Sequence, residues 1–327
     1  MCRKFFWLVG AALVVAGSGA AWAQQNVVVP GSRDFPESIT STADGTLFMS
    51  SMAGGRIFRA LPGATEAAEW IKPGTNGLLS VLGVLADEKT NTLYACSPDM
   101  SGLGVKVSTG QPPGALKTFD LKTGAPKGNF PLPDPHLFGQ TSLCNDIALG
   151  PDGTAYVTDS LNAQILRLKP GAKELEVWAT DDRWKVKGKA QLDGIAVLND
   201  GNVYANIFEG NGLYRVQVRP DGSAGMVTKL NTSLPLYHSD GLRPYQGDKL
   251  LMVEGEGVGR LDLITISGDN ANIDVVKGGF EGPVSVTAVG DIAYVTNTPL
   301  KYLFVPEYKT KTPPPFTAFA VKLPPAQ

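Results

Sequence analysis

A sequence unit that recurs roughly every fifty residues constrains the fold of this chain more than any other feature. In its four clearest copies a polar residue lies seven positions before a tight turn: Glu37 and Asp44, Asn145 and Asp152, Asp193 and Asp200, Asp240 and Gly247. Weaker copies occupy residues 83–95 and 281–295, which brings the number of copies to six. One such unit cannot bury an apolar core by itself, so the repeats must pack against one another.

The repeated units are predicted to consist of β-strands. Their Asp-Gly pairs are typical of hairpin turns, because both residues tolerate the positive φ angles that two-residue loops require. A second hairpin follows, as in residues 164–168 and 174–178, so that each unit supplies about four strands. We therefore predict an all-β, six-bladed β-propeller with four-stranded antiparallel blades. Residues 26–29 and 316–321 are the candidate strands that close the last blade.

The start of the chain has the pattern of a secretory signal peptide. Arg3 and Lys4 precede an apolar run over residues 5–16, and an Ala-Trp-Ala cleavage motif follows. The run is too short and too interrupted by glycine to predict a membrane span. We predict a signal peptide over residues 1–23 and a single propeller domain over residues 24–327. The expected location is secreted or periplasmic, with no membrane partner after cleavage.

Two cysteines, Cys96 and Cys144, remain after such a cleavage. They are not spaced as C-x-x-C, which argues against a zinc ribbon or a redox pair. Export would permit a disulfide between them. Two separate, buried, apolar thiols are the simpler expectation, and it is the one we adopt.

Charge and missing motifs narrow the range of partners. The chain has 29 basic and 31 acidic residues and a pI near 5.8, which gives no electrostatic reason to expect nucleic acid or an anionic membrane. It has no G-x-S-x-G motif, and its histidines are His136 and His238. A Ser-His-Asp hydrolase would have to use one of these two. The expected partner is a small-molecule substrate.

Polar residues at equivalent positions of the blades are predicted to form a ring, because the first strand of each blade lines the channel. Glu37, Asn145, Asp193 and Asp240 would lie at one rim, where the second blade offers only residues 83–84. Three carboxylates in a narrow channel repel one another unless a cation or protons neutralise them. Oxygen ligands without His or Cys favour one divalent cation, Ca²⁺, with Mg²⁺, Mn²⁺ or Zn²⁺ as alternatives. The simpler alternative is that these residues bond to neighbouring backbone groups.

Other polar groups are expected near the same rim. Glu281 occupies a comparable place in the sixth copy, but nine positions before its turn. His238 either faces the channel or is an ordinary loop histidine. The long loop over residues 97–114 either covers the channel mouth or is a surface insertion, and the basic segment 183–189 either overhangs the same face or is solvated. The second strands end in polar residues that we expect to be mostly structural: Ser50, Ser51, Asp159, Ser160, Asn206, Glu254 and Asn297.

At these residues the chain resembles the family of gluconolactonases, senescence marker proteins and luciferin-regenerating enzymes. The clearest stretch is residues 145–160, and the resemblance extends loosely over residues 33–300. It implies a six-bladed propeller with one divalent cation, held by a first-blade Glu, a third-blade Asn, a fourth-blade Asn and a fifth-blade Asp. The corresponding positions are listed here by blade: Glu37, Asn145, Asp193 and Asp240. Because Asp193 stands where the family has Asn, we expect tighter cation binding and weaker Lewis acidity.

The ring and the resemblance together predict a metal-dependent hydrolase of a lactone or a related cyclic ester. The cation would activate the carbonyl group and a water molecule. Asp240 is the expected general base, with Asp193 as the alternative. A non-catalytic, metal-stabilised propeller that binds a ligand or a partner protein is a second hypothesis. A lyase or condensing enzyme similar to strictosidine synthase is a third, although its chemistry does not need an acidic rim.

Overall fold

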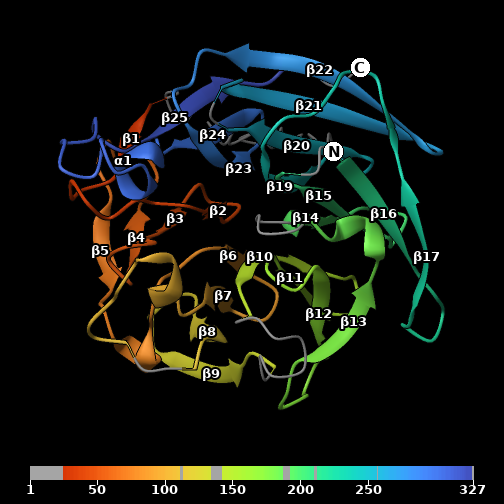
Figure 1. The fold of residues 1–327 in the computed structure, drawn as a ribbon, viewed down its shortest axis with the longest axis horizontal. Coiled ribbons are helices and arrows are strands. Elements are labelled where there is room, and N and C mark those ends of the chain that lie inside the picture. Colours follow the sequence, from red (N-terminus) through yellow and green to blue (C-terminus); the bar gives the residue numbers. More distant parts are fainter. Residues whose placement is uncertain are drawn as a thin grey trace, which may run out of the picture.

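The structure is a computed structural model that describes residues 25–110, 113–133, 142–186, 192–209, 212–255 and 257–325. In these residues, six sheets, antiparallel apart from one short strand, are arranged around a central channel (Figure 1). The prediction of a six-bladed propeller is therefore confirmed. The predicted signal peptide and His136 lie outside the described residues. No described helix has both the length and the apolar character needed to cross a membrane.

The first three blades each have four strands, which run in sequence order from the channel outward. Blade one contains β2 (Ile39–Ser41), β3 (Leu47–Ser50), β4 (Ile57–Ala60) and β5 (Ala68–Ile71). Blade two contains β6 (Val84–Asp87), β7 (Thr92–Ser97), β8 (Ala115–Asp120) and β9 (Pro126–Pro131). Blade three contains β10 (Cys144–Leu149), β11 (Ala155–Asp159), β12 (Gln164–Leu168) and β13 (Glu176–Thr180).

The next two blades continue this order. Blade four contains β14 (Leu192–Val197), β15 (Val203–Ile207), β16 (Gly212–Val218) and β17 (Ala224–Lys229). Blade five contains β19 (Ser239–Tyr245), β20 (Lys249–Glu254), β21 (Arg260–Ser267) and β22 (Asn270–Gly278). A short strand, β18 (Asn231–Thr232), pairs in parallel with β22, so this blade has five strands. The four-stranded prediction thus holds for the other blades.

Blade six joins the two ends of the described chain. Its strands are β23 (Pro283–Val289), β24 (Ile292–Asn297), β25 (Thr317–Lys322) and β1 (Val27–Val28). Val27 pairs with Ala318 and Val28 with Thr317, so the predicted closing strands are confirmed. Behind them, the rings of Phe35 and Phe316 pack with centroids 5.1 Å apart. This closure ties the first described strand to the last and holds the ring of blades together.

Short helices occur only in loops of the described chain. The 3-10 helices are η1 (Thr75–Gly77), η2 (Ser101–Leu103) and η4 (Asp182–Trp184), and α1 (Lys301–Phe304) is a single helical turn between β24 and β25. The Asp-Gly pairs lie in the hairpin turns between the first two strands of their blades, as predicted, but these connections have five residues and only the glycines have positive φ angles. Gly45, Gly153 and Gly201 have φ angles of 91°, 86° and 77°.

The apolar core lies between neighbouring blades. One buried cluster joins blades three and four through Trp178, Trp184 and Tyr214. Another joins blades four and five through Tyr204 and Met252. Because these side chains are interblade contacts, they fix how closely the innermost strands approach one another around the channel.

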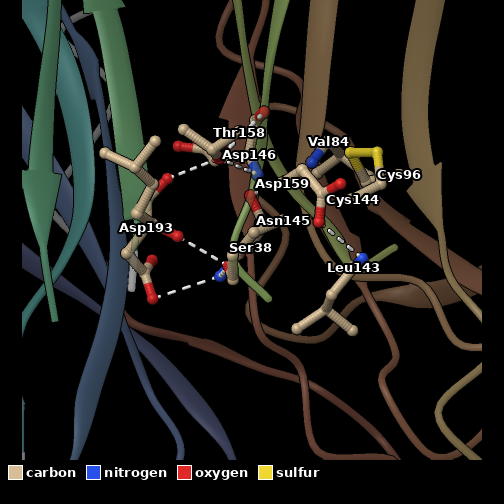
Figure 2. Close-up of a disulfide and its surroundings, with 12 residues drawn as sticks. Ser38, Val84, Cys96, Leu143, Cys144, Asn145, Asp146, Thr158, Asp159 and Asp193 are labelled. Atoms are coloured by element: carbon tan, nitrogen blue, oxygen red, sulfur yellow. Dashed lines mark hydrogen bonds between the residues drawn. A yellow bond between two sulfur atoms is a disulfide. The ribbon is translucent and has the colours of Figure 1, made fainter. Parts of the chain in front are cut away.

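A disulfide joins Cys96 in β7 to Cys144 in β10 (Figure 2). The expectation of two separate thiols is therefore wrong. The two strands belong to adjacent blades and bring the Cα atoms to 5.3 Å, a separation that suits a disulfide although the residues are 48 positions apart in sequence. The bond anchors the start of β10, one residue before Asn145.

Candidate metal centre

Four polar residues begin the channel-lining strands at the same end of the propeller. Glu37 precedes β2, and Asn145, Asp193 and Asp240 are the second residues of β10, β14 and β19. Glu37, Asp193 and Asp240 are buried, and one carboxylate oxygen from each lies within 4.8 Å of the others. The structure thus brings together the three carboxyl groups of the predicted ring.

A β-bulge shapes each of the three inner strands where its polar residue lies. The pairing register shifts between Cys144 and Ile147 in β10, between Leu192 and Ile195 in β14, and between Ser239 and Leu242 in β19. A bulge redirects a side chain that the regular alternation of a strand would place elsewhere. These bulges therefore account for the inward direction of three residues at one height.

Two of the bulges require glycine because the innermost strands nearly touch there. A Cβ atom on Gly194 would lie 2.5 Å from the Asp240 carbonyl oxygen, and one on Gly241 would lie 2.7 Å from the Ser285 Cα. The sequence analysis predicts ring positions at residues 193 and 240 but no bulges. The glycine that follows each Asp within a predicted inner strand is the sequence feature that indicates a bulge.

Polar side chains from the second strands support the ring from behind. Thr158 in β11 donates to the Asp193 carbonyl oxygen at 2.6 Å (Figure 2). Asn206 in β15 accepts from Gly194 N–H at 2.8 Å and donates to the Asp240 carbonyl oxygen at 2.6 Å. Blade three thus holds the bulge of blade four, and blade four holds that of blade five. The structural role expected for Asn206 agrees with these bonds.

The remaining strand-end residues are also engaged in hydrogen bonds. Ser50 Oγ accepts from the backbone N–H of Glu37, and Ser160 Oγ donates to the Leu192 carbonyl oxygen. The others bond to nearby groups: Ser51 to Asp34, Asp159 to Leu143 N–H, Glu254 to Tyr237 N–H and Asn297 to Gly282 N–H. These residues hold backbone in place around the channel.

The Asn145 amide is oriented in a way that fits a cation ligand. Its Nδ2 donates to Asp193 Oδ2 at 3.1 Å (Figure 2). The same Nδ2 donates to Ser160 Oγ at 3.0 Å. Its buried Oδ1 accepts no hydrogen bond from the described residues. Buried polar atoms nearly always have a partner, and an amide oxygen beside three carboxyl groups is a donor that Ca²⁺ accepts. The donor set therefore fits a hard divalent cation.

Burial and mutual repulsion raise the pKa values of the three carboxyl groups. Burial is the largest cause for each. The pKa of Asp193 rises to about 7, with the Asp146 charge as the second cause. The pKa values of Glu37 and Asp240 are raised well above their usual range, and the charge of Asp193 contributes to both. Such a cluster retains protons unless a positive charge replaces them.

A buried arginine lies beside the ring, and sequence reasoning missed it. Arg243 in β19 forms an ion pair with Asp146 in β10, with Nη1 and Oδ2 2.5 Å apart and both side chains 6% exposed. Its Nη2 donates to Ser38 Oγ at 3.1 Å and to the Val84 carbonyl oxygen at 3.3 Å. The guanidinium thus connects blade five with blades three, one and two. Its signal was a charged residue within a channel-lining strand.

A cavity of about 320 Å³ opens above the carboxyl groups. Glu37, Asn145, Asp193 and Asp240 belong to its lining. Met100 and Leu103, from the long loop of blade two, line it as well, so this loop reaches the channel mouth. Residues of the β24–β25 connection, including α1, also border the cavity. The volume lies at the small end of the range for small-molecule sites.

Of the other polar residues expected near the rim, His238 lies at the cavity and Glu281 lies apart from the ring. His238 lines the cavity, and its ring stacks on Phe208 with centroids 4.8 Å apart and planes 11° from parallel. Glu281 does not join the ring, because its carboxylate pairs with Lys301 at 2.9 Å and its side chain is 42% exposed. The two-residue difference in its offset from the turn accounts for this separate position.

The basic segment is only partly described. Trp184 is buried, and Arg183 pairs with Asp181 at 2.6 Å. Lys185 pairs with Asp182 at 2.5 Å. These three residues thus have roles in the local structure, and residues 187–191 lie outside the described chain.

Comparisons with known proteins bear on the fold. No family model matches the chain, and no curated protein matches it. A solved structure of a candidate gluconolactonase aligns with a TM-score of 0.63 and 14% identity, over 91% of this chain and 91% of its own. A gluconolactonase from Xanthomonas campestris aligns with a TM-score of 0.60 and 16% identity, over 89% of this chain and 86% of its own. Virginiamycin B lyase from Staphylococcus aureus aligns with a TM-score of 0.57 and 16% identity, over 84% of this chain and 81% of its own.

Likeness at such identities concerns architecture, because one fold carries many activities. It agrees with the blade order and closure described above. The chain is a six-bladed β-propeller that structurally resembles gluconolactonases and related lyases at low sequence identity.

Proposed function

We propose that the chain is a metal-dependent hydrolase of a lactone or a related cyclic ester. The supporting observation is the convergence of three buried carboxyl groups and the unpaired Asn145 Oδ1 on the floor of one cavity. The proposed ligands are Glu37, Asn145, Asp193 and Asp240, and the proposed cation is Ca²⁺ because every donor is an oxygen atom. A cation bound there would supply Lewis acidity toward a carbonyl group and lower the pKa of water.

The protein's own groups would position and deprotonate the attacking water. The carboxyl groups of Asp240 and Asp193 share a hydrogen bond, so a proton can reside on this pair. Burial raises the pKa of Asp193 to about 7 and that of Asp240 well above its usual range. We assign the role of base to Asp240, which the family resemblance favours, with Asp193 as its hydrogen-bonding partner and the alternative base. Apolar side chains above the floor limit the entry of bulk water.

The test is hydrolysis of a lactone panel by the purified protein, followed in a pH-stat with Ca²⁺ or with EDTA. We expect turnover that EDTA removes and Ca²⁺ restores. Asp240→Asn should lower turnover by about a hundredfold or more while the circular dichroism spectrum stays unchanged. Asp221→Asn, in the exposed β16–β17 turn, is the matched control and should retain activity. Full activity of Asp240→Asn would refute the role of that carboxylate.

The position of His238 favours a second candidate, a lyase that opens the ring by elimination. His238 and Asp240 line the same cavity. Among the similar structures is virginiamycin B lyase with quinupristin, in a variant that a histidine-to-alanine substitution makes catalytically inactive. In elimination, a base removes a proton from the carbon next to the C–O bond, that bond breaks, a C=C bond forms and the carboxylate leaves. Hydrolysis adds one water to the product and elimination adds none, so mass spectrometry in ¹⁸O-water distinguishes the two.

A non-catalytic propeller would behave differently in the same experiments. Ca²⁺ would raise the melting temperature, and none of the lactones would be consumed. Metal-dependent stability without turnover would therefore replace the hydrolase proposal with a binding function.

The proposed site of action is outside the cytoplasm, either secreted or periplasmic. The predicted signal peptide and the Cys96–Cys144 disulfide both support this, because such bonds persist in oxidising compartments. Fractionation of the producing cell tests it, and recovery of the uncleaved protein from the cytoplasm would contradict it.

A further inference from the structure

The cavity above the carboxyl groups has apolar walls. The polar groups proposed as ligands form its floor, whereas the side chains above them are largely hydrocarbon or aromatic. Six of these wall residues come from five blades or their loops: Met52, Leu82, Met100, Leu143, Phe208 and Val284. A single apolar residue would carry no information, but a predominantly apolar wall over a charged floor indicates which class of ligand fits the cavity.

Several polar groups on the walls are already engaged within the protein. The Thr298 hydroxyl donates to the Pro36 carbonyl oxygen. Lys301 pairs with Glu281, and the His238 ring lies against Phe208. Glu209 also borders the cavity, so the polar groups of the wall are few beside its apolar side chains.

Large apolar side chains continue to the mouth of the cavity and are exposed there. Leu103 in η2 is 46% exposed, and Phe304 at the end of α1 is 37% exposed. They come from blade two and blade six, so two separate loops place apolar groups at one opening. Exposed apolar side chains gathered at a cavity mouth are typical of a surface that an apolar ligand covers.

A polyhydroxylated ring suits such walls poorly. Each sugar hydroxyl leaves hydrogen bonds to water and needs a replacement, and an unmade hydrogen bond is costly. An alkyl or aryl substituent loses nothing by entering, and each methylene group that leaves water contributes favourably. The wall chemistry thus discriminates between two classes of lactone that share the same reacting ester.

We propose that the substrate is a lactone or cyclic ester with an alkyl or aryl substituent, and that this substituent occupies the apolar part of the cavity while the ester lies over Glu37, Asp193 and Asp240. This inference rests on the proposed hydrolase function. It names the substrate class and separates the chain from enzymes that act on polyhydroxylated sugar lactones.

The first experiment compares δ-valerolactone, δ-heptalactone, δ-nonalactone and glucono-δ-lactone in Ca²⁺ buffer, with spontaneous hydrolysis subtracted. We expect kcat/KM to rise about fourfold per added methylene until the cavity is filled. Glucono-δ-lactone should be the poorest of the four. Equal rates across the alkyl series, or a preference for glucono-δ-lactone, would overturn the substrate class and leave the hydrolase function intact.

Two variants locate the effect in the cavity. Phe304→Ser and Leu103→Ser change exposed side chains and should fold, yet each should reduce the gain per methylene. Met226→Ser is the matched control, because Met226 is a 66% exposed residue of β17 outside the cavity lining. An unchanged chain-length dependence in both cavity variants would contradict the proposal.

A binding measurement separates the inference from the function on which it rests. 6-Butyl-2-piperidinone has the shape of δ-nonalactone but an amide in place of the ester, so it reports binding without turnover. By calorimetry it should bind at least tenfold more tightly than 2-piperidinone. If it does and no lactone is hydrolysed, the proposed function fails and the apolar ligand class stands. If the two lactams bind equally, the ligand class fails.

Discussion

Replacing Arg243 with Met tests whether the buried guanidinium holds the acidic channel together. Met keeps an unbranched apolar stem but removes the charge that pairs with Asp146. Asp146 would then lose its positively charged partner and become a fourth uncompensated, buried carboxyl group in the channel, together with Glu37, Asp193 and Asp240. The four groups and the guanidinium carry three net negative charges when all are ionised, so the substitution makes the channel more negative.

The expected cost follows from the burial of the pair. Removing one partner of a buried ion pair destabilises a protein by about 3–5 kcal/mol, because the other charge is left without compensation. With an unfolding entropy of about 2.1 cal/mol/K per residue, a chain of roughly 300 residues loses about 5–8 °C of melting temperature. The double variant Asp146→Leu/Arg243→Met removes both charges and should lie much closer to the wild type.

Differential scanning calorimetry in EDTA and in Ca²⁺ measures these differences. Ca²⁺ should stabilise Arg243→Met by more degrees than it stabilises the wild type, because the ion replaces part of the missing positive charge. Arg219→Met removes an exposed arginine and serves as the control. If Arg243→Met melts within about 1 °C of the wild type in EDTA, the role assigned to the guanidinium is wrong.

Four further predictions concern the proposed cation and the disulfide. Because burial raises the pKa of Asp193 to about 7, Ca²⁺ must displace a proton below that pH. Its affinity measured by calorimetry should fall by at least about fifty-fold from pH 7 to pH 5, since protons on Glu37 and Asp240 add to the effect. The same raised pKa means that the metal-free protein loses stability as the pH rises from about 4 to about 7, which thermal melts in EDTA would show. Asp193→Asn should weaken Ca²⁺ binding by about tenfold or more, since the ligand charge falls; an unchanged affinity would exclude Asp193 as a ligand. Replacing Cys96 and Cys144 by Ser should lower the free energy of unfolding by about 4 kcal/mol in urea titrations, because the bond closes a loop with a sequence separation of 48. Equal stability with and without the bond would contradict that estimate.

The repeat predicted the blade number, the turns and the height of the ring because all three depend on spacing along one chain. A polar residue seven positions before each turn has to emerge at the same end of every inner strand. For this reason Asn145 and Asp240 lie at one level. Glu281, with an offset of nine, departs from the spacing and also from the ring.

Features that depend on contacts between blades were not predicted from that spacing. Cys96 and Cys144 meet because a second strand of one blade lies beside the first strand of the next. Arg243 reaches Asp146 across the channel, over a separation of 97 positions. The bulges depend on how near the inner strands come, as the space at Gly194 shows. Predicting each of these features requires the distance between neighbouring blades, and the spacing of a repeat along the sequence does not give that distance.

The acidic floor and the apolar walls form one electrostatic arrangement. Burial is the largest cause of the raised pKa values of Glu37, Asp193 and Asp240, and the cavity walls contribute to that burial. In a more hydrated cavity, water would screen the charges of the carboxyl groups and lower their pKa values. A bound cation would then stabilise the ionised groups by less. An apolar substituent in the cavity acts in the opposite direction, because it displaces water and strengthens every interaction at the floor. A substrate with such a substituent would thus tighten cation binding as it binds, whereas a hydrated sugar lactone would keep water near the charges. Calcium affinity measured with and without 6-butyl-2-piperidinone should therefore rise in its presence, and reciprocity requires the lactam to bind more tightly when Ca²⁺ is present.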